Sequence, residues 1–144
     1  MVDKKIIHRD IKLENILVKD EIIKLCDYGE SKLLNTLYQK ENTTHAGSRL
    51  TMAPEILEDK PYDSKSDLWS LGVIIYQMYF NDFPYKANTE HALFIKITND
   101  KNQKHIKENS TKNKELDDLI LNLLKYNPDE RLNWNEYFNH PFFK

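Results

Sequence analysis

The 144-residue sequence is poor in cysteine, has no excess of positive charge and contains no long hydrophobic segment. Cys26 is the only cysteine, which excludes an internal disulfide and favours a reducing compartment such as the cytosol or nucleus. The formal net charge of -2 argues against partners that are bound through a basic surface, such as nucleic acid or an anionic membrane. The longest uncharged run, residues 68–81, is too short to span a bilayer, and the N-terminal segment MVDKKIIHRD lacks the apolar core of a signal peptide. We therefore expect a cytoplasmic protein with no membrane span and no nucleic-acid partner.

The composition suits one folded domain. Hydrophobic residues make up 40% of the sequence and charged residues 31%, which is typical of a soluble globular protein. A chain of this length can bury one core but is too short for two ordinary domains. The sequence shows no internal repeat, and it leaves the oligomeric state open.

A short β-hairpin is expected near the N-terminus. Residues 15–18 and 22–26 are rich in isoleucine, leucine and valine, and a polar tripeptide separates them. Because a hairpin returns the chain on itself, Asp27 is expected to come back close to Asn15. The polar stretch at residues 30–51 then predicts a long loop, and loops of this length inside a compact domain are often functional.

The second half of the sequence predicts helices. One should begin at Ser66 or Asp67 and, because an uncharged run follows, be buried on nearly all sides. Residues 88–98 predict a modest amphipathic helix. One face of a further helix is predicted by the spacing of Leu116, Leu119, Ile120, Leu123 and Leu124. Asn133 resembles the N-cap of a last short helix, with a glutamate three residues later.

Two further segments complete this half. Residues 99–114 are almost wholly polar, which indicates a solvated connection with fragments of helix. Phe142 and Phe143, close to the C-terminus, are expected to tuck into the core.

Four polar residues near the N-terminus form a constellation suited to a magnesium–nucleotide. Asn15 and Asp27 offer oxygen ligands, which a hard cation prefers. Asp10 can accept a hydroxyl proton, and Lys12 supplies positive charge where a transferring phosphoryl group develops negative charge. Catalysis of phosphoryl transfer consists mostly of positioning and charge neutralisation, so this set is sufficient in kind. Any one of these residues alone would more often be a turn or cap residue.

Six short motifs of the sequence, taken in order, resemble those of a known protein family. Residues 8–15 read HRDIKLEN, residues 27–29 read DYG and residues 53–55 read APE. Three further segments also match, namely DLWSLG at 67–72, NPDER at 127–131 and HPFF at 140–143. In this order they resemble the C-terminal lobe of a eukaryotic protein kinase. The C-terminal sequence most resembles that of the autophagy-initiating serine/threonine kinases, although calcium/calmodulin-type kinases end in related ways.

The resemblance implies a fold, an activity and two cofactors. It implies a partial protein-kinase-like fold over residues 1–144, with a mainly α-helical C-terminal lobe, a short β-hairpin and no N-terminal lobe. Residues 27–55 would form the activation segment. The implied activity is a serine/threonine protein kinase that transfers the γ-phosphate of ATP to protein hydroxyls, with ATP and Mg²⁺ as cofactors and a protein as substrate.

The resemblance also implies roles for the four residues of the constellation. Asp10 would be the catalytic base. Lys12 sits where serine/threonine-specific members place a lysine that contacts phosphate. Asn15 and Asp27 would bind the metal. The catalytic set is thus Asp10, Lys12 and Asn15, and Lys12, Asn15 and Asp27 would face the nucleotide.

Regulatory and structural roles carry over to other positions. Arg9 would face a phosphate on the activation segment, for which Tyr38, Thr43 and Thr44 are candidate acceptors. The hydroxyl of Ser48 would touch the base and Lys12. A further implication is an ion pair between the glutamate of APE, Glu55, and the arginine of NPDER, Arg131.

The sequence departs from the family pattern at several positions. Tyr28 replaces the usual phenylalanine, whereas Arg49 and Thr51 replace a common proline and aromatic residue along the expected peptide groove. The 144-residue sequence also holds no glycine-rich loop and no counterpart of the lysine that the family carries on a strand. The 144-residue chain is therefore expected to be inactive alone. Two alternatives stay open: a non-catalytic protein-interaction module, and an incomplete gene product with no independent role.

Overall fold

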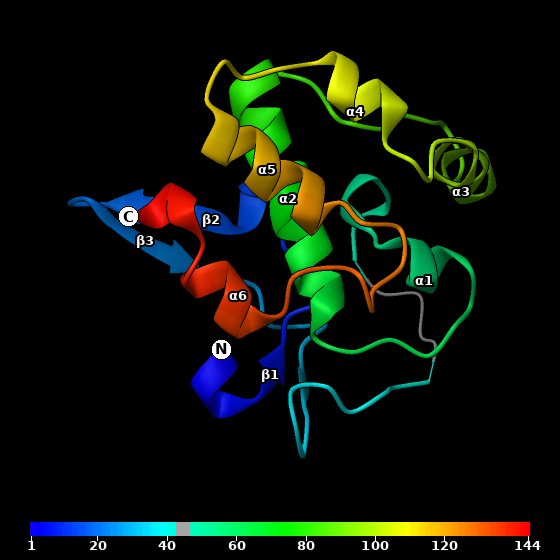
Figure 1. Ribbon diagram of the computed structural model, residues 1–144. Helices are drawn as coiled ribbons and strands as arrows, with labels where there is room; N and C mark the ends of the chain where they lie inside the picture. Colours follow the sequence, from blue (N-terminus) through cyan, green and yellow to red (C-terminus); the bar gives the residue numbers. More distant parts are fainter. Residues whose placement is uncertain (43–46) are drawn as a thin grey trace.

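The computed structural model describes residues 1–42 and 47–144. Figure 1 shows one long helix, α2, at the centre, with short helices above and to one side of it and a β-hairpin on the other side. The strands are β1 (Ile6–Ile7), β2 (Ile16–Lys19), β3 (Ile22–Leu25) and β4 (Lys32–Leu33). The helices are α1 (Pro54–Leu57), α2 (Lys65–Phe80), α3 (Glu90–Asn99), α4 (Lys104–Glu108), α5 (Lys114–Leu123) and α6 (Trp134–Phe138). Short 3-10 turns lie at Val2–Lys4, Leu13–Asn15, Arg49–Thr51 and Pro141–Phe143.

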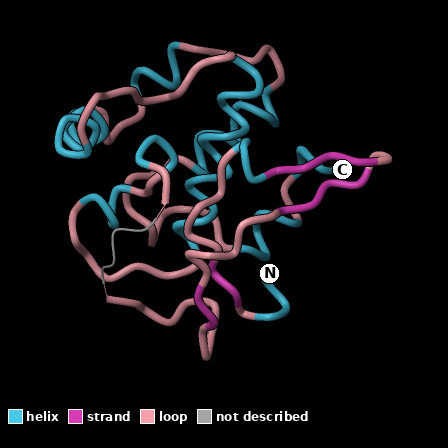
Figure 2. Tube along the Cα trace, turned by 180° about the vertical axis from the view of Figure 1, so that it is seen from behind, coloured by secondary structure: helices cyan, strands magenta, loops and turns pink. Residues whose placement is uncertain are grey.

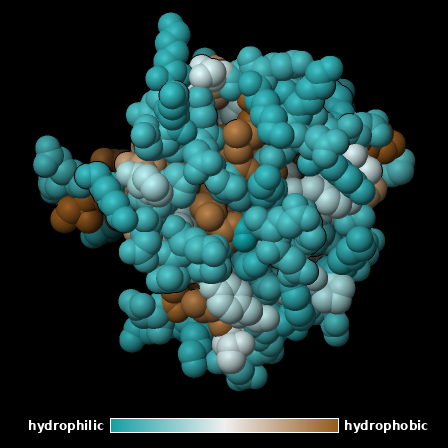
Figure 3. Space-filling view, viewed as in Figure 1, coloured by the Kyte–Doolittle hydropathy of each residue, from teal (hydrophilic) through white to brown (hydrophobic). Residues whose placement is uncertain are grey.

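The strands form two antiparallel pairs, β1 with β4 and β2 with β3. The second pair is the hairpin that the sequence predicts, and its register runs from Ile16 opposite Leu25 to Lys19 opposite Ile22. Figures 1 and 2 show the hairpin projecting away from the helices. Its side chains are correspondingly exposed, up to 72% for Ile23. On the face drawn in Figure 3, apolar residues gather at the left edge, where the hairpin leaves the body.

Helix α2 forms the centre of the core. It packs against α5 so closely that a Cβ atom at Gly72 would lie 2.8 Å from Cβ of Leu123, so only glycine fits there without movement. The helix begins within two residues of the predicted start and is mostly buried as far as Tyr76. The expectation of burial on nearly all sides is wrong for the last turn, where Met78 is 70% and Tyr79 50% exposed. In that turn Phe80 still packs against the core, whereas Met78 and Tyr79 are not part of it.

Two apolar clusters lie on either side of α2. The larger one includes Trp69, Tyr76 and Ile120, and the smaller one includes Leu68 and Leu119. Helix α5 therefore contributes to both clusters, and the apolar face predicted for residues 116–124 is confirmed, since all five of its apolar residues are buried. Helix α3 confirms the amphipathic prediction, and the hydroxyl of Thr89 caps it by accepting the N–H of Ala92.

Residues 99–114 form only in part the solvated connection that was expected. Helix α4 is one of the expected fragments of helix, but Ile106 and Thr111 are buried instead of solvated. Gln103 is only 2% exposed, and its side-chain Nε2 donates to the carbonyl oxygens of Leu121 (2.7 Å) and Leu124 (2.8 Å). The last carbonyls of a helix have no partner within the helix, so this polar segment folds back to cap α5.

The C-terminal segment differs from its expectation as well. The capping box at Asn133 is confirmed, because its side chain accepts the N–H of Glu136 and the carboxylate of Glu136 accepts the N–H of Asn133. Phe142 and Phe143, however, are 38% and 49% exposed, so the prediction that they enter the core is wrong. They lie in a surface turn, where the ring of Phe143 packs on Tyr137 at 5.2 Å. Over residues 1–42 and 47–144, no helix is both long and apolar enough to cross a membrane.

Candidate active site

The loop between β1 and β2 gathers the predicted site residues around Asp10. The Asp10 carboxylate is nearly buried, and its Oδ2 accepts hydrogen bonds from Nζ of Lys12 (2.7 Å) and Nδ2 of Asn15 (3.1 Å). Its Oδ1 accepts the backbone N–H (2.8 Å) and the hydroxyl (2.9 Å) of Ser48. Lys12 also donates to the Ser48 hydroxyl oxygen at 2.9 Å, so the expected contact of this hydroxyl with both residues is confirmed.

These contacts set the charge of the site. Burial alone would raise the pKa of Asp10, but hydrogen bonds from Lys12 and Ser48 outweigh it and hold the pKa below its ordinary value. The hydrogen bond to Asp10 raises the pKa of Lys12 in turn. Asp10 is therefore ionised and Lys12 protonated at neutral pH. A carboxylate in this state can accept a proton, and its orientation is fixed by four donors.

Asp27 approaches this group through the hairpin. The N–H of Cys26 donates to the carbonyl oxygen of Asn15 at 2.9 Å, so the end of β3 lies against the start of β2 as the sequence predicts. Asp27 itself has a positive φ of 61°, and its carboxylate accepts the N–H of Gly29 at 3.3 Å. Its negative charge acts on both His8 and Lys12. The hairpin thus places a second carboxylate beside the Asp10 group.

The donor set suits Mg²⁺ bound to a nucleotide. The Nδ2 group of Asn15 is engaged by the carbonyl and the carboxylate of Asp10, which leaves the amide oxygen as the atom that could bind a cation. Asp27 adds carboxylate oxygens. Mg²⁺ is usually bound by one or two such protein groups together with phosphate oxygens and water. The residues present therefore fit this ion.

Asp67, at the start of α2, holds the backbone of the loop between β1 and β2. Its carboxylate accepts the N–H of His8 (2.7 Å) and the N–H of Arg9 (2.9 Å). Burial raises the pKa of Asp67 to about 6, against the opposing effect of these two hydrogen bonds. Sequence reasoning placed Asp67 only at a helix start and missed this role. The signal available was a single carboxylate that heads an uncharged, buried run.

His8 is a packed side chain. It is fully buried, and its Nδ1 accepts the N–H of Asp10 (3.3 Å) while its Nε2 donates to the carbonyl oxygen of Cys26 (3.1 Å). Burial lowers the pKa of His8, which keeps the ring neutral. The ring of Tyr28 lies 4.8 Å from it, so the aromatic residue of the DYG motif still packs against the catalytic loop.

Gly47 brings the segment that precedes α1 against the loop between β1 and β2. This residue has a φ of 98°, and a Cβ atom there would lie 2.1 Å from the carbonyl oxygen of Arg9. Arg9 donates to the hydroxyl of Tyr62 at 3.0 Å and to the carbonyl oxygen of Glu30. Of the candidate phosphate acceptors, Tyr38 is 45% exposed, whereas Thr43 and Thr44 lie outside the described residues.

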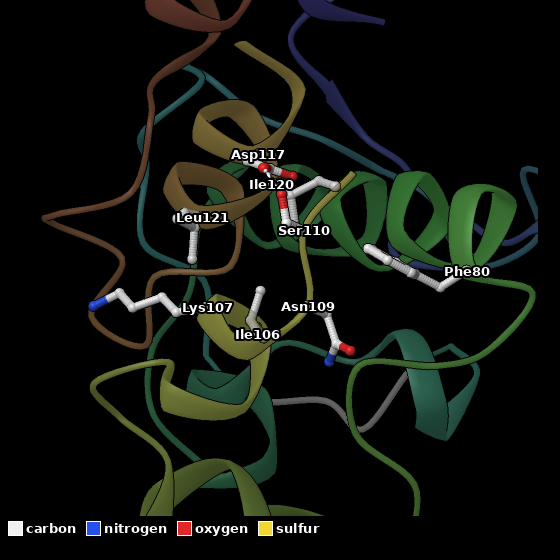
Figure 4. A pocket seen from close by; sticks show the side chains of 8 residues that line it. All are labelled: Phe80, Ile106, Lys107, Asn109, Ser110, Asp117, Ile120 and Leu121. Atoms are coloured by element: carbon white, nitrogen blue, oxygen red, sulfur yellow. Dashed lines mark hydrogen bonds between the residues drawn. The ribbon is translucent and has the colours of Figure 1, made fainter. Parts of the chain in front are cut away.

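A separate cavity, of about 160 Å³, lies at the other end of α2 (Figure 4). It is bordered by Phe80 of α2 and by side chains of α4 and α5, among them Ile106 and Ile120. The carboxylate of Asp117 at its rim is already held by the N–H of Thr111 and the hydroxyl of Ser110. Phe80, which borders the cavity, lies about 20 Å from Asp67 along the axis of α2. This hollow is a gap between packed helices, and the group around Asp10 lies at the opposite end of α2.

Comparison with known proteins agrees with this geometry. A family model described as "Protein kinase domain" matches residues 1–143. The chain is 39% identical to the serine/threonine-protein kinase TIO of Arabidopsis thaliana, over 97% of this chain and 10% of that protein. It is 36% identical to the serine/threonine-protein kinase atg1 of Dictyostelium discoideum, over 95% of this chain and 20% of that protein. It is 37% identical to the serine/threonine-protein kinase ATG1a of Arabidopsis thaliana, over 99% of this chain and 23% of that protein. The chain therefore spans a quarter or less of the length of these relatives.

Proposed function

The chain belongs to the protein kinase family, and from this membership we propose that it forms the catalytic region of a serine/threonine protein kinase. The reaction is transfer of the γ-phosphate of ATP to hydroxyl groups of a protein substrate. Residues 1–144 constitute the C-terminal lobe of the kinase domain, with the activation segment at 27–55. We place the protein in the cytoplasm, in line with its single cysteine.

One observation carries this proposal: four hydrogen bonds hold Asp10 as an ionised carboxylate beside Lys12. Asp10 accepts the proton of the substrate hydroxyl. Lys12, held 2.7 Å from Asp10, supplies positive charge beside the transferred phosphoryl group. Ser48 keeps the base and the lysine in this arrangement.

Asn15 and Asp27 hold Mg²⁺ when the nucleotide is bound. The ion supplies charge neutralisation on the phosphates, which is a large part of catalysis in phosphoryl transfer. Asn15 is preoriented for this role, because its amide nitrogen is fixed on Asp10. Asn15 directly precedes β2 and Asp27 follows β3, so the two ligands lie at the open end of the hairpin.

The 144-residue polypeptide does not complete this site by itself. Its sequence holds three glycines, at positions 29, 47 and 72, and these form no glycine-rich loop. We propose that a further segment covers the nucleotide and that these residues expressed alone transfer no phosphate. The alternative is a non-catalytic module that binds other proteins through its surface.

The experiment compares the 144-residue chain with a longer product read in frame from the coding sequence upstream of Met1. If that reading supplies a glycine-rich loop and a strand lysine, the longer product should phosphorylate a generic protein substrate in the presence of Mg²⁺. Asp10→Asn should lower this rate by at least about 100-fold, the usual contribution of a general base. Asp20→Asn is the matched control, because Asp20 lies in the exposed hairpin turn and should tolerate asparagine at its positive φ.

Full activity of the Asp10→Asn variant would refute the role of the base. Robust Mg²⁺-dependent phosphorylation by the 144 residues alone would refute the need for a further segment. If no kinase-like segment is encoded upstream and no activity is found, the interaction module is the better description.

A further inference from the structure

A cavity of about 330 Å³ opens beside the candidate active site. Lys12 and Ser48 form part of its wall, and both of them contact the Asp10 carboxylate. Leu50 and Phe83 give the wall an apolar part, and Glu14 and Arg49 bring opposite charges to it. The cavity therefore begins one side chain away from the proposed base.

Arg49 is the unusual member of this wall. It follows Ser48 directly and lies in the 3-10 turn Arg49–Thr51. Its side-chain Nε is buried and, among the residues that the structure describes, has no hydrogen-bond partner. A buried N–H without an acceptor is unfavourable, more so on a charged group, so a ligand that brings an acceptor here gains a hydrogen bond that the protein alone does not make.

The two other charged residues of the cavity, Lys12 and Glu14, make different interactions. The ammonium group of Lys12 is bound to Asp10 and to the Ser48 hydroxyl. Glu14 is exposed, and its charge acts on Lys12. Arg49 is thus the cation of this wall whose side chain has an N–H without a partner among the described residues.

We propose that this cavity receives a substrate side chain close to the phosphorylated serine or threonine, and that Arg49 selects an acidic one. The inference rests on the proposed function, which places the acceptor hydroxyl at Asp10. An extended peptide advances about 3.3 Å per residue, so a side chain one or two residues from the acceptor reaches the cavity. An aspartate or glutamate there supplies the acceptor that Arg49 Nε lacks, and a guanidinium binds a carboxylate with well-matched geometry. Arg49 is a specificity residue, distinct from the catalytic set.

The test uses serine peptides that differ at one position, one or two residues before or after the serine, and carry Asp, Asn or Leu there. Phosphorylation is measured with the longer, active product, and peptide binding is measured separately by fluorescence anisotropy with the 144-residue chain. At one of these positions, Asp should be preferred over Asn by about tenfold in kcat/KM and in affinity, the factor that a single good charge-assisted hydrogen bond can supply. The preference should weaken as salt concentration rises.

Two variants test whether Arg49 is the source of the preference for the Asp peptide. Arg49→Gln should abolish the preference for the Asp peptide over the Asn peptide. Glu14→Gln should keep or increase it, because this change removes the like charge from the wall. Thermal unfolding shows whether each variant is folded. If a variant is not folded, the comparison of the Asp and Asn peptides with the wild-type protein still tests the inference.

Equal use of Asp and Asn peptides by the wild type would overturn the inference, as would an acidic preference that survives Arg49→Gln. Failure to phosphorylate any peptide would count instead against the proposed function. The binding measurement, which needs no phosphoryl transfer, would still show whether Arg49 selects a carboxylate.

Discussion

Arg131 holds Glu55 through two parallel hydrogen bonds, although 76 positions separate them in the sequence. The distances are 2.8 Å from Nη1 to Oε1 and 3.0 Å from Nη2 to Oε2, and the two side chains are 0% and 5% exposed. Arg131 also donates to the carbonyl oxygens of Lys65 and Lys125. The guanidinium therefore ties α1 to the start of α2 and to the end of α5. The ion pair implied by the APE and NPDER motifs is confirmed.

Arg131→Ala and Glu55→Ala should each destabilise the fold by roughly 3–5 kcal/mol, because each leaves a buried charge without its partner. The double variant should lose much less than the sum, since the second change removes the orphaned charge. A double-mutant cycle by denaturant unfolding measures this coupling. The exposed pair Lys86–Asp82 serves as the control and should show little coupling. Two small and additive effects at Glu55 and Arg131 would contradict the structure.

Gly47→Ala should disturb the meeting of the activation segment with the catalytic loop. The added methyl group would overlap the carbonyl oxygen of Arg9, and alanine disfavours the positive φ by about 1–2 kcal/mol before any overlap is counted. Gly29→Ala is the matched control for stability, because its Cβ would lie 3.2 Å from a side-chain oxygen of Asp27, a contact that a small movement of that side chain relieves, and no positive φ is required. The measurement is the free energy of unfolding of both variants. Equal losses would mean that the close approach at Gly47 does not exist.

Ser48→Ala should raise the pKa of Asp10. The change removes the hydroxyl donor to Oδ1, whereas the backbone N–H of residue 48 and the Lys12 ammonium remain. The direction follows because hydrogen bonds to the ionised form lower a carboxyl pKa. Titration of the Asp10 carboxyl carbon by NMR measures the shift, with Ser31→Ala as the control, since Ser31 donates to the carbonyl oxygen of His8 instead. An unchanged Asp10 titration would show that the Ser48 hydroxyl does not act on the base.

Asp67 and His8 should give opposite contributions to stability below neutral pH. The folded-state pKa of Asp67 is raised to about 6, so between about pH 4 and 6 the folded state binds a proton that the unfolded state lacks. This contribution to stability is therefore present at low pH and is lost as pH rises through 6. The pKa of His8 is lowered by burial, so below about pH 6.5 the unfolded state binds the extra proton and stability falls as pH falls.

Variants separate the two contributions. Compared with wild type, Asp67→Asn should lose stability more steeply on acidification from pH 6.5 to 4, whereas His8→Gln should lose less or gain. Each difference is limited to about 1.4 kcal/mol per pH unit, the value for one proton. Urea unfolding midpoints across this range provide the measurement. Parallel pH profiles for all three proteins would show that neither group titrates as the structure requires.

Gln103→Ala should weaken the docking of the polar segment onto α5. The change leaves the carbonyl oxygens of Leu121 and Leu124 without these donors, at a cost of about 1–3 kcal/mol. The neighbouring Asn102 is exposed, and Asn102→Ala should have little effect on the free energy of unfolding. If both changes are equally mild in denaturant unfolding, the cap contributes nothing.

Features that depend on neighbouring residues can be predicted from the amino-acid sequence. The hairpin follows from two β-branched runs with a polar turn, the buried face of α5 from the spacing of its leucines, and the start of α6 from Asn133 and Glu136. Each of these rests on contacts within a few positions of the chain. The order of the motifs also identified the family, and it paired Glu55 with Arg131 before any coordinates placed them together.

The hydrogen-bond partners of polar groups that are distant in the sequence depend on the tertiary structure. Asp67 accepts backbone N–H groups of His8 and Arg9, which lie 59 and 58 positions away, and no local pattern reveals such a partner. Gln103 is buried because α5 ends beside it, although its own segment reads as solvated. Phe142 and Phe143 stay at the surface because a terminal turn packs only where neighbouring elements leave room. Periodicity records which face of an element is apolar, whereas the partner of a buried polar group depends on how the whole chain closes around it.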